Sequence, residues 1–133
     1  MRGHADKRWR LLIVDDEPLV LRALARSLGK DYEVTTFPSS AEALHSLTSS
    51  NSWDAILSDM VMPGMDGVEF ARRAVAARPD LAGRIMIMTG GTCTRRACSA
   101  LEQSGLTVIA KPIDLAHLRA LFAAMSSGPD QAV

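Results

Sequence analysis

Short runs of apolar or β-branched residues recur along the chain, and each run ends at a polar residue or a proline. Such runs are too short for free-standing helices and are typical of buried strands. Strands are therefore predicted at residues 11–14, 32–37, 55–58, 85–88 and 107–110. A buried helix segment could show the same pattern. Pro18 follows the first run closely, however, and it suits the first turn of a helix, which favours a strand before it.

Apolar residues at helical spacing lie between these runs. Helices are predicted at about 18–28, after the capping-box residues Ser39 and Glu42, from Asp66 to about 78, at about 94–104, and from Asp114 to about 125. Serine and aspartate often precede helices because their oxygens accept hydrogen bonds from the free N–H groups of the first turn. Gly29 and Gly105 provide stop signals for the first and fourth helices.

Strands and helices alternate, which predicts right-handed crossovers and a parallel sheet with helices on both faces. The expected fold class is α/β, with a doubly wound five-stranded (βα)5 sheet in three α/β/α layers. One domain is expected over residues 10–125, since 133 residues with 47% hydrophobic content can bury one sizeable core. Residues 1–9 are expected to form a disordered lead-in and residues 126–133 a disordered tail, because both segments are mainly polar.

Charge and composition exclude some classes of partner. Fifteen basic and fifteen acidic residues cancel, so non-specific binding to nucleic acid or to an anionic membrane is not expected. The apolar runs are far below the roughly 18 residues of a membrane span, and the N-terminus lacks an apolar signal segment, which predicts a cytoplasmic protein. Cys93 and Cys98 lack the further ligands of a zinc site and are predicted to be free thiols.

Four of the predicted strands end at residues with useful chemistry. Asp15 and Asp16 follow the first strand, Asp59 the third, Thr89 the fourth and Lys111 the fifth. The carboxyl ends of parallel strands meet at one edge of a sheet, and ligands bind there in open α/β folds. We therefore expect these five side chains to converge, although they are far apart in the sequence.

Carboxylates without a neighbouring His or Cys suit a hard divalent ion such as Mg²⁺, which prefers oxygen ligands. Lys111 can neutralise a phosphate, and Thr89 can donate a hydrogen bond to one of its oxygens. Asp59 stands apart from the other acids and is the candidate nucleophile, which would attack phosphorus to give an aspartyl phosphate. Together these residues predict a site that holds a phosphoryl group.

The motifs that carry these residues resemble those of the receiver domains of two-component response regulators, the CheY-like family. The resemblance covers about residues 10–125 and rests on Val14-Asp15-Asp16-Glu17-Pro18, Ser58-Asp59-Met60-Val61-Met62-Pro63-Gly64-Met65-Asp66-Gly67, Met88-Thr89-Gly90-Gly91 and Ala110-Lys111-Pro112. It implies a flavodoxin-like fold and a phosphorelay in which a kinase histidine phosphorylates Asp59. It also implies that Mg²⁺ binds to Asp15, Asp16, Asp59 and the carbonyl of Val61. Thr89 and Lys111 would contact the phosphate, and Lys111-Pro112 would be a cis peptide.

The same resemblance implies partners and output. The phosphodonor would be a sensor histidine kinase or a phosphotransfer protein, and the surface of the fourth helix, fifth strand and fifth helix would bind an effector or a second copy. Such a domain is not an enzyme, since it catalyses only its own phosphorylation and dephosphorylation. The stretch from Met88 to Ile113 resembles receivers at the C-terminal end of hybrid sensor kinases more than it resembles free receivers of the chemotaxis type. Val108 departs from the family pattern, because a Tyr or Phe usually stands there and swings inward with the threonine.

Three other functions fit parts of the pattern. An aspartyl-phosphate phosphatase would also use a strand-end aspartate and Mg²⁺, but such enzymes carry a second acid two residues after the nucleophile, where this chain has Val61. A flavodoxin-like cofactor binder would need a Ser/Thr/Gly-rich loop after the first strand, where carboxylates would repel a flavin phosphate. A degenerate receiver that acts as an interaction module without phosphorylation stays open, although all five site residues are present.

Overall fold

Five parallel strands form one sheet in the computed structural model, which describes residues 8–49, 52–90 and 94–126. The strands are β1 (Arg10–Val14), β2 (Glu33–Phe37), β3 (Ala55–Asp59), β4 (Ile85–Thr89) and β5 (Thr107–Ala110). Their order across the sheet is β2-β1-β3-β4-β5. The predicted α/β class with a doubly wound parallel sheet is confirmed. The expected disordered lead-in and tail fall mainly on residues 1–7 and 127–133, which lie outside the described residues.

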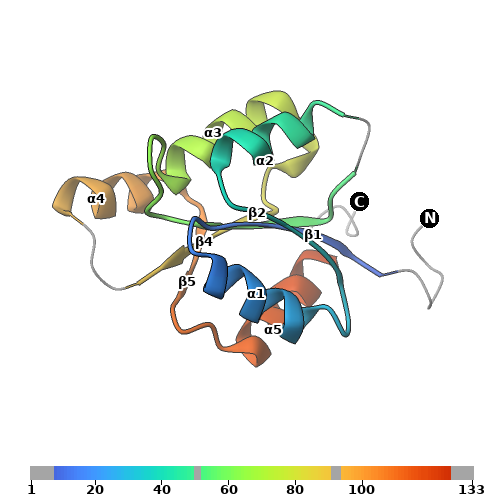
Figure 1. The fold of residues 1–133 in the computed structure, drawn as a ribbon. Helices are drawn as coiled ribbons and strands as arrows, with labels where there is room; N and C mark the ends of the chain where they lie inside the picture. Colours follow the sequence, from blue (N-terminus) through green and yellow to red (C-terminus); the bar gives the residue numbers. More distant parts are fainter. Residues whose placement is uncertain (1–7, 50–51, 91–93, 127–133) are drawn as a thin grey trace.

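Helices cover both faces of this sheet. They are α1 (Pro18–Leu28), α2 (Ser40–Leu47), α3 (Gly67–Ala77), α4 (Arg95–Ser104) and α5 (Leu115–Ser126), with a short 3-10 helix η1 (Pro79–Leu81) that the sequence pattern did not predict. α1 and α5 lie on one face and α2 and α3 on the other, while α4 projects outward on the β4–β5 side (Figure 1). The three-layer arrangement is therefore confirmed. No helix in the described ranges is long and apolar enough to cross a bilayer.

The helices begin and end where their capping residues predict. Pro18 is the first residue of α1. The side chain of Ser39 accepts a hydrogen bond from the Glu42 N–H at 3.2 Å, and the side chain of Asp66 accepts one from the Glu69 N–H at 2.9 Å. Gly105 ends α4 with φ of 73°, a left-handed conformation that glycine adopts without steric cost.

The core has two halves, one on each face of the sheet, because successive strand residues point to opposite faces. Towards α2 and α3 the strands contribute Leu12, Val14, Ile56, Ile85 and Ile87. Towards α1 and α5 they contribute Leu11, Ile13, Leu57, Met86 and Met88. The central strands are thus covered on both sides. This double burial explains why the sequence shows unbroken apolar runs and not the alternation of a half-exposed sheet.

Two local features differ from the expectations. Cys98 is disulfide-bonded, so the prediction of free thiols is wrong for this residue, while Cys93 lies outside the described residues. Two cysteines close in sequence are compatible with either redox state, and composition could not decide between them. Trp9, which was predicted to lie in the disordered lead-in, packs against Phe122 with ring centroids 5.8 Å apart. Its carbonyl also accepts a hydrogen bond from the Glu33 N–H at 2.8 Å.

Candidate functional site

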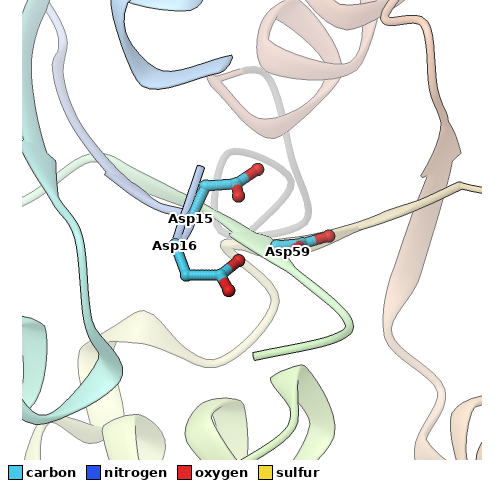
Figure 2. Close-up of side chains that lie close together, drawn as sticks. All are labelled: Asp15, Asp16 and Asp59. Carbon is cyan, nitrogen blue, oxygen red and sulfur yellow. The ribbon is translucent and has the colours of Figure 1, made fainter. Parts of the chain in front are cut away.

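Three carboxylates gather at the carboxyl edge of the sheet. Asp59 is the last residue of β3, and Asp15 and Asp16 follow directly after β1. β1 and β3 are neighbours whose register pairs Val14 with Ser58, so the acids that end the two strands are brought side by side. One oxygen from each of Asp15, Asp16 and Asp59 lies within 4.8 Å of the others, and Figure 2 shows the three side chains grouped in this way. The predicted convergence of these acids is confirmed.

The three acids differ in exposure. Asp15 and Asp59 are buried, whereas Asp16 is exposed. One oxygen of Asp15, Oδ1, accepts a hydrogen bond from the Glu17 N–H at 3.0 Å. This bond holds the Asp15 side chain in one rotamer, because the Glu17 N–H belongs to the turn that leads into α1. The exposed Asp16 leaves one side of the cluster accessible to solvent and to a ligand.

Lys111 reaches this cluster from the end of β5. Its Nζ lies 2.9 Å from Asp59 Oδ1 and 3.3 Å from Asp15 Oδ2. A third carboxylate, that of Glu17, lies 4.0 Å from the same nitrogen. The peptide between Lys111 and Pro112 is cis, as the resemblance implied. The predicted lysine is thus part of the cluster and bridges its two buried acids.

Burial and charge act together on these groups. Burial raises the pKa of Asp15, and repulsion from Asp59 adds to this, while the Glu17 N–H and the Lys111 ammonium oppose it. Burial disfavours the Lys111 ammonium, but its hydrogen bond to Asp59 and the charges of both buried acids outweigh this and raise the pKa of Lys111. The ammonium is therefore held firmly in its charged form, and Asp15 gains a proton more readily than an exposed aspartate.

Thr89 and Val61 are the remaining predicted site residues. Thr89 is the last residue of β4, and its carbonyl accepts a hydrogen bond from the Lys111 N–H at 2.8 Å. Val61 follows Met60 in the loop before α3 and is 63% exposed. Thr89 thus lies at the carboxyl edge of the sheet, whereas Val61 is placed only by its position two residues after Asp59. Their contacts with a phosphate or a metal ion stay predictions.

The donor set suits a hard divalent cation. All three grouped side chains offer carboxylate oxygens and no nitrogen or sulfur, which is the preference of Mg²⁺ and not of zinc or copper. Mg²⁺ is commonly held by one or two carboxylates and keeps several waters that substrate oxygens can replace. The residues present therefore fit a magnesium ion.

Two residues that adjoin Asp59 were not predicted to take part in the site. Ser58 is fully buried, and its hydroxyl donates a hydrogen bond to the carbonyl of Asp59. Gly67, the first residue of α3, lies directly against the same carbonyl. A signal existed in both cases: Ser58 is the only hydroxyl in the run from Ala55 to Ser58, and Gly67 follows the aspartate that caps a helix.

Comparison with known proteins gives consistent matches. The sequence profile of the Response regulator receiver domain matches residues 11–123. The DNA-binding transcriptional regulator NtrC of Escherichia coli (strain K12) is 36% identical over 116 residues, which make up 86% of this chain and 24% of NtrC. The response regulator receiver protein CpdR of Brucella abortus (strain 2308) is 36% identical over 113 residues, or 84% of this chain and 89% of CpdR. The chain thus spans about a quarter of NtrC and most of CpdR.

A solved structure agrees with these matches. The response regulator receiver domain protein from Clostridium thermocellum has a TM-score of 0.80 to this chain at 26% identity, and the superposition covers 94% of this chain and 99% of that one.

Proposed function

The chain belongs to the response regulator receiver domain family, and from this premise we propose that it accepts a phosphoryl group on Asp59 in a two-component phosphorelay. The observation that carries the proposal is the short distance of 2.9 Å between Lys111 Nζ and Asp59 Oδ1, inside a cluster with two further aspartates. A carboxylate of this kind can act as a nucleophile when neighbouring cations stabilise the charge of the transition state.

The proposed step is an in-line displacement. An oxygen of the Asp59 carboxylate attacks the phosphorus of a phosphohistidine, an O–P bond forms, and the P–N bond breaks with its electron pair going to the imidazole nitrogen. Lys111 neutralises phosphoryl oxygens as the group arrives, and the hydroxyl of Thr89 donates to one of them. Little other covalent chemistry is asked of the protein, so its main contribution is positioning and charge.

Magnesium is the proposed cofactor. Asp15, Asp16, Asp59 and the carbonyl of Val61 would hold it, and when bound it would supply positive charge to the phosphoryl oxygens. The buried Asp15 is oriented for this role by the Glu17 N–H. In keeping with the family, the domain would not be an enzyme for a separate substrate, and it would act in the cytoplasm.

The proposed partners are a sensor histidine kinase or phosphotransfer protein as donor, and an effector or second copy as recipient of the signal. The recipient surface would be formed by α4, β5 and α5, where Val108 is 41% exposed. NtrC is described as a DNA-binding regulator, but this chain corresponds to about a quarter of it, so the proposal does not include DNA binding. A place in a hybrid kinase stays a prediction.

The test is intact-mass measurement after incubation with acetyl phosphate and Mg²⁺. We expect one phosphoryl adduct in the wild type and none in Asp59→Asn, because an amide is a poor nucleophile and one metal ligand charge is lost. The exposed Asp31→Asn variant, away from the cluster, is the matched control and should be labelled like wild type. EDTA should abolish labelling of both the wild type and Asp31→Asn. A wild type without adduct would support the phosphorylation-independent module instead, and an Asp59→Asn protein labelled at the wild-type rate would refute the assigned nucleophile.

A further inference from the structure

A buried hydroxyl lies in an apolar layer next to the proposed acceptor. Ser58 is fully buried in β3. Its register partners on the neighbouring strands are Val14 and Ile87, which are also fully buried. A hydroxyl placed among aliphatic side chains is costly unless it forms a hydrogen bond. An alanine or valine would suit this layer better, so the presence of serine calls for an explanation.

The hydrogen bond of Ser58 provides an explanation for the serine. Its Oγ donates to the backbone carbonyl oxygen of Asp59 at 3.0 Å. Asp59 is the last residue of β3, where the regular ladder of the sheet ends. Beyond it, the Met60 N–H donates to the Met88 carbonyl at 2.9 Å. The peptide that follows the acceptor is therefore held by the sheet through its N–H and by Ser58 through its carbonyl.

A second residue restrains the same carbonyl from α3. A Cβ atom added at Gly67 would lie 2.6 Å from the Asp59 carbonyl oxygen and 3.1 Å from Met60 Cα. The Gly67 N–H donates to the Met60 carbonyl at 2.8 Å. Only a residue without a side chain lets the first turn of α3 approach this closely. The start of α3 thus rests directly on the peptide of the acceptor.

We infer that Ser58 and Gly67 are positioning residues for the phosphoryl acceptor, which clamp the Asp59 carbonyl oxygen between a hydroxyl and a bare helix backbone. The clamp fixes the direction in which the Asp59 side chain leaves the strand, and with it the 2.9 Å approach to Lys111. This inference rests on the proposed function, since it concerns the same transfer. Reaction rates depend steeply on such alignment, and a misplacement of about 1 Å can cost on the order of 100-fold.

A purely structural role predicts something different. If the site only needs a small side chain for packing, the hydroxyl itself would be irrelevant and volume alone would matter. Ser58→Thr and Ser58→Val separate the two roles, because both add similar volume and both suit a strand, but only threonine keeps the hydroxyl. The packing role predicts equal behaviour of the two variants.

The experiment measures phosphoryl uptake from acetyl phosphate at saturating Mg²⁺, together with the thermal midpoint of each variant. We expect the maximal rate of Ser58→Val to fall about tenfold or more below that of Ser58→Thr. The acetyl phosphate concentration for half-maximal rate should stay similar, because the clamp does not touch the donor. Equal maximal rates in the two variants would overturn the inference. A wild type that is not labelled on Asp59 would instead refute the proposed function, so the two failures are distinguishable.

Gly67→Ala provides an independent arm. If both residues act through one carbonyl, their effects should not be independent. The fold-loss of rate in the Ser58→Val/Gly67→Ala double variant should then be smaller than the product of the fold-losses in the two single variants. Multiplicative losses would show that the two residues act separately and would overturn the shared clamp. Should Gly67→Ala fail to fold, the threonine and valine pair still decides the role of the hydroxyl.

Discussion

At the scale of single residues, the candidate site holds like charges close together in a buried position. Asp15 and Asp59 are both buried and share the ammonium of Lys111, which lies 3.3 Å and 2.9 Å from their oxygens. One ammonium does not neutralise three carboxylates, and burial together with repulsion from Asp59 raises the pKa of Asp15. The same excess of negative charge favours a divalent cation. The features that make the site useful therefore also make it costly for the fold.

The cost at Asp15 can be measured through pH. The pKa of Asp15 is raised in the folded state, so the protonated carboxyl contributes its full stabilisation of the fold below the ordinary pKa of 3.8. This stabilisation is lost as pH rises through the raised pKa. An amide at this position does not titrate, so Asp15→Asn would show no such loss. In EDTA we therefore expect the thermal midpoint of Asp15→Asn to rise relative to that of the wild type as pH increases from about 4 to 7. A gain of 1 kcal/mol would correspond to roughly 4 °C in a domain of this size.

The exposed neighbour serves as control for this experiment. Asp16→Asn removes the same charge from the same loop without a buried carboxylate, so its midpoint should follow wild type more closely over the pH range. A difference between Asp15→Asn and wild type that stays constant with pH would show that the raised pKa does not contribute to stability.

The lifetime of the adduct should depend on Val61. Hydrolysis of an aspartyl phosphate needs a water held in line, and the exposed aliphatic side chain of Val61, two residues after the acceptor, offers no group to orient it. We expect Val61→Asn to shorten the lifetime of the adduct about tenfold. Leu19→Asn, at a residue of α1 that is 74% exposed, is the matched control and should leave the lifetime unchanged. Equal lifetimes in wild type and Val61→Asn would contradict this view. Gly91, two residues after Thr89, is the other position at which a side chain could orient such a water, and it lies outside the described residues.

At the scale of elements, local signals predicted most of the structure. Unbroken apolar runs mark β1, β3 and β4 because both faces of these strands are covered. Side-chain caps mark the starts of α2, α3 and α4 because Ser39, Asp66 and Thr94 accept from the first turn. The 3-10 helix η1 was missed, since three residues carry no periodicity. The disulfide at Cys98 was missed for a related reason, because pairing is a property of distance and not of pattern.

The element with the weakest packing should carry the response. α4 buries only Leu101, whereas α3 buries Gly67, Phe70, Ala71 and Ala74. Local opening is cheapest where few apolar contacts are made, so amide exchange in α4 should be faster than in α3. Beryllofluoride stands in for the phosphoryl group at the site beside β4. Its binding there should raise the protection of amides in residues 94–104 against exchange. Since Val108 provides no ring to rotate, α4 is the proposed switch. Unchanged exchange in α4, with the main change elsewhere, would contradict this prediction.

At the scale of the whole molecule, the sheet separates two edges with different tasks. The carboxyl edge holds the acids and Lys111, and their convergence could be predicted from the alternation of strands and helices along the chain, which implies a parallel sheet. The clamp on the Asp59 carbonyl could not be predicted in this way, because it depends on the close approach of Gly67 in α3 to the end of β3. The amino edge carries aromatic packing: Trp9 and Tyr32 both contact the ring of Phe122. Contacts of this kind join residues that are remote in sequence, so no local sequence pattern predicts them.

This aromatic packing predicts where the folded unit begins. Trp9 contacts Phe122 of α5 at 5.8 Å between centroids, and the Arg84 guanidinium lies 5.8 Å from the centre of the Trp9 ring. Because aromatic pairs contribute roughly 0.5–1.5 kcal/mol beyond the area they bury, we expect Trp9→Ala to lose about 1–3 kcal/mol in urea unfolding. Relative to a chain shortened to residues 8–126, one shortened to 10–126 should lose at least as much stability as Trp9→Ala loses, because it also removes the Trp9 carbonyl that accepts from the Glu33 N–H. Phosphoryl uptake should stay unchanged in all three, since Trp9 precedes β1 and the acids follow it. Equal stability of the two shortened chains would place the boundary at Arg10 and would reduce Trp9 to a surface contact.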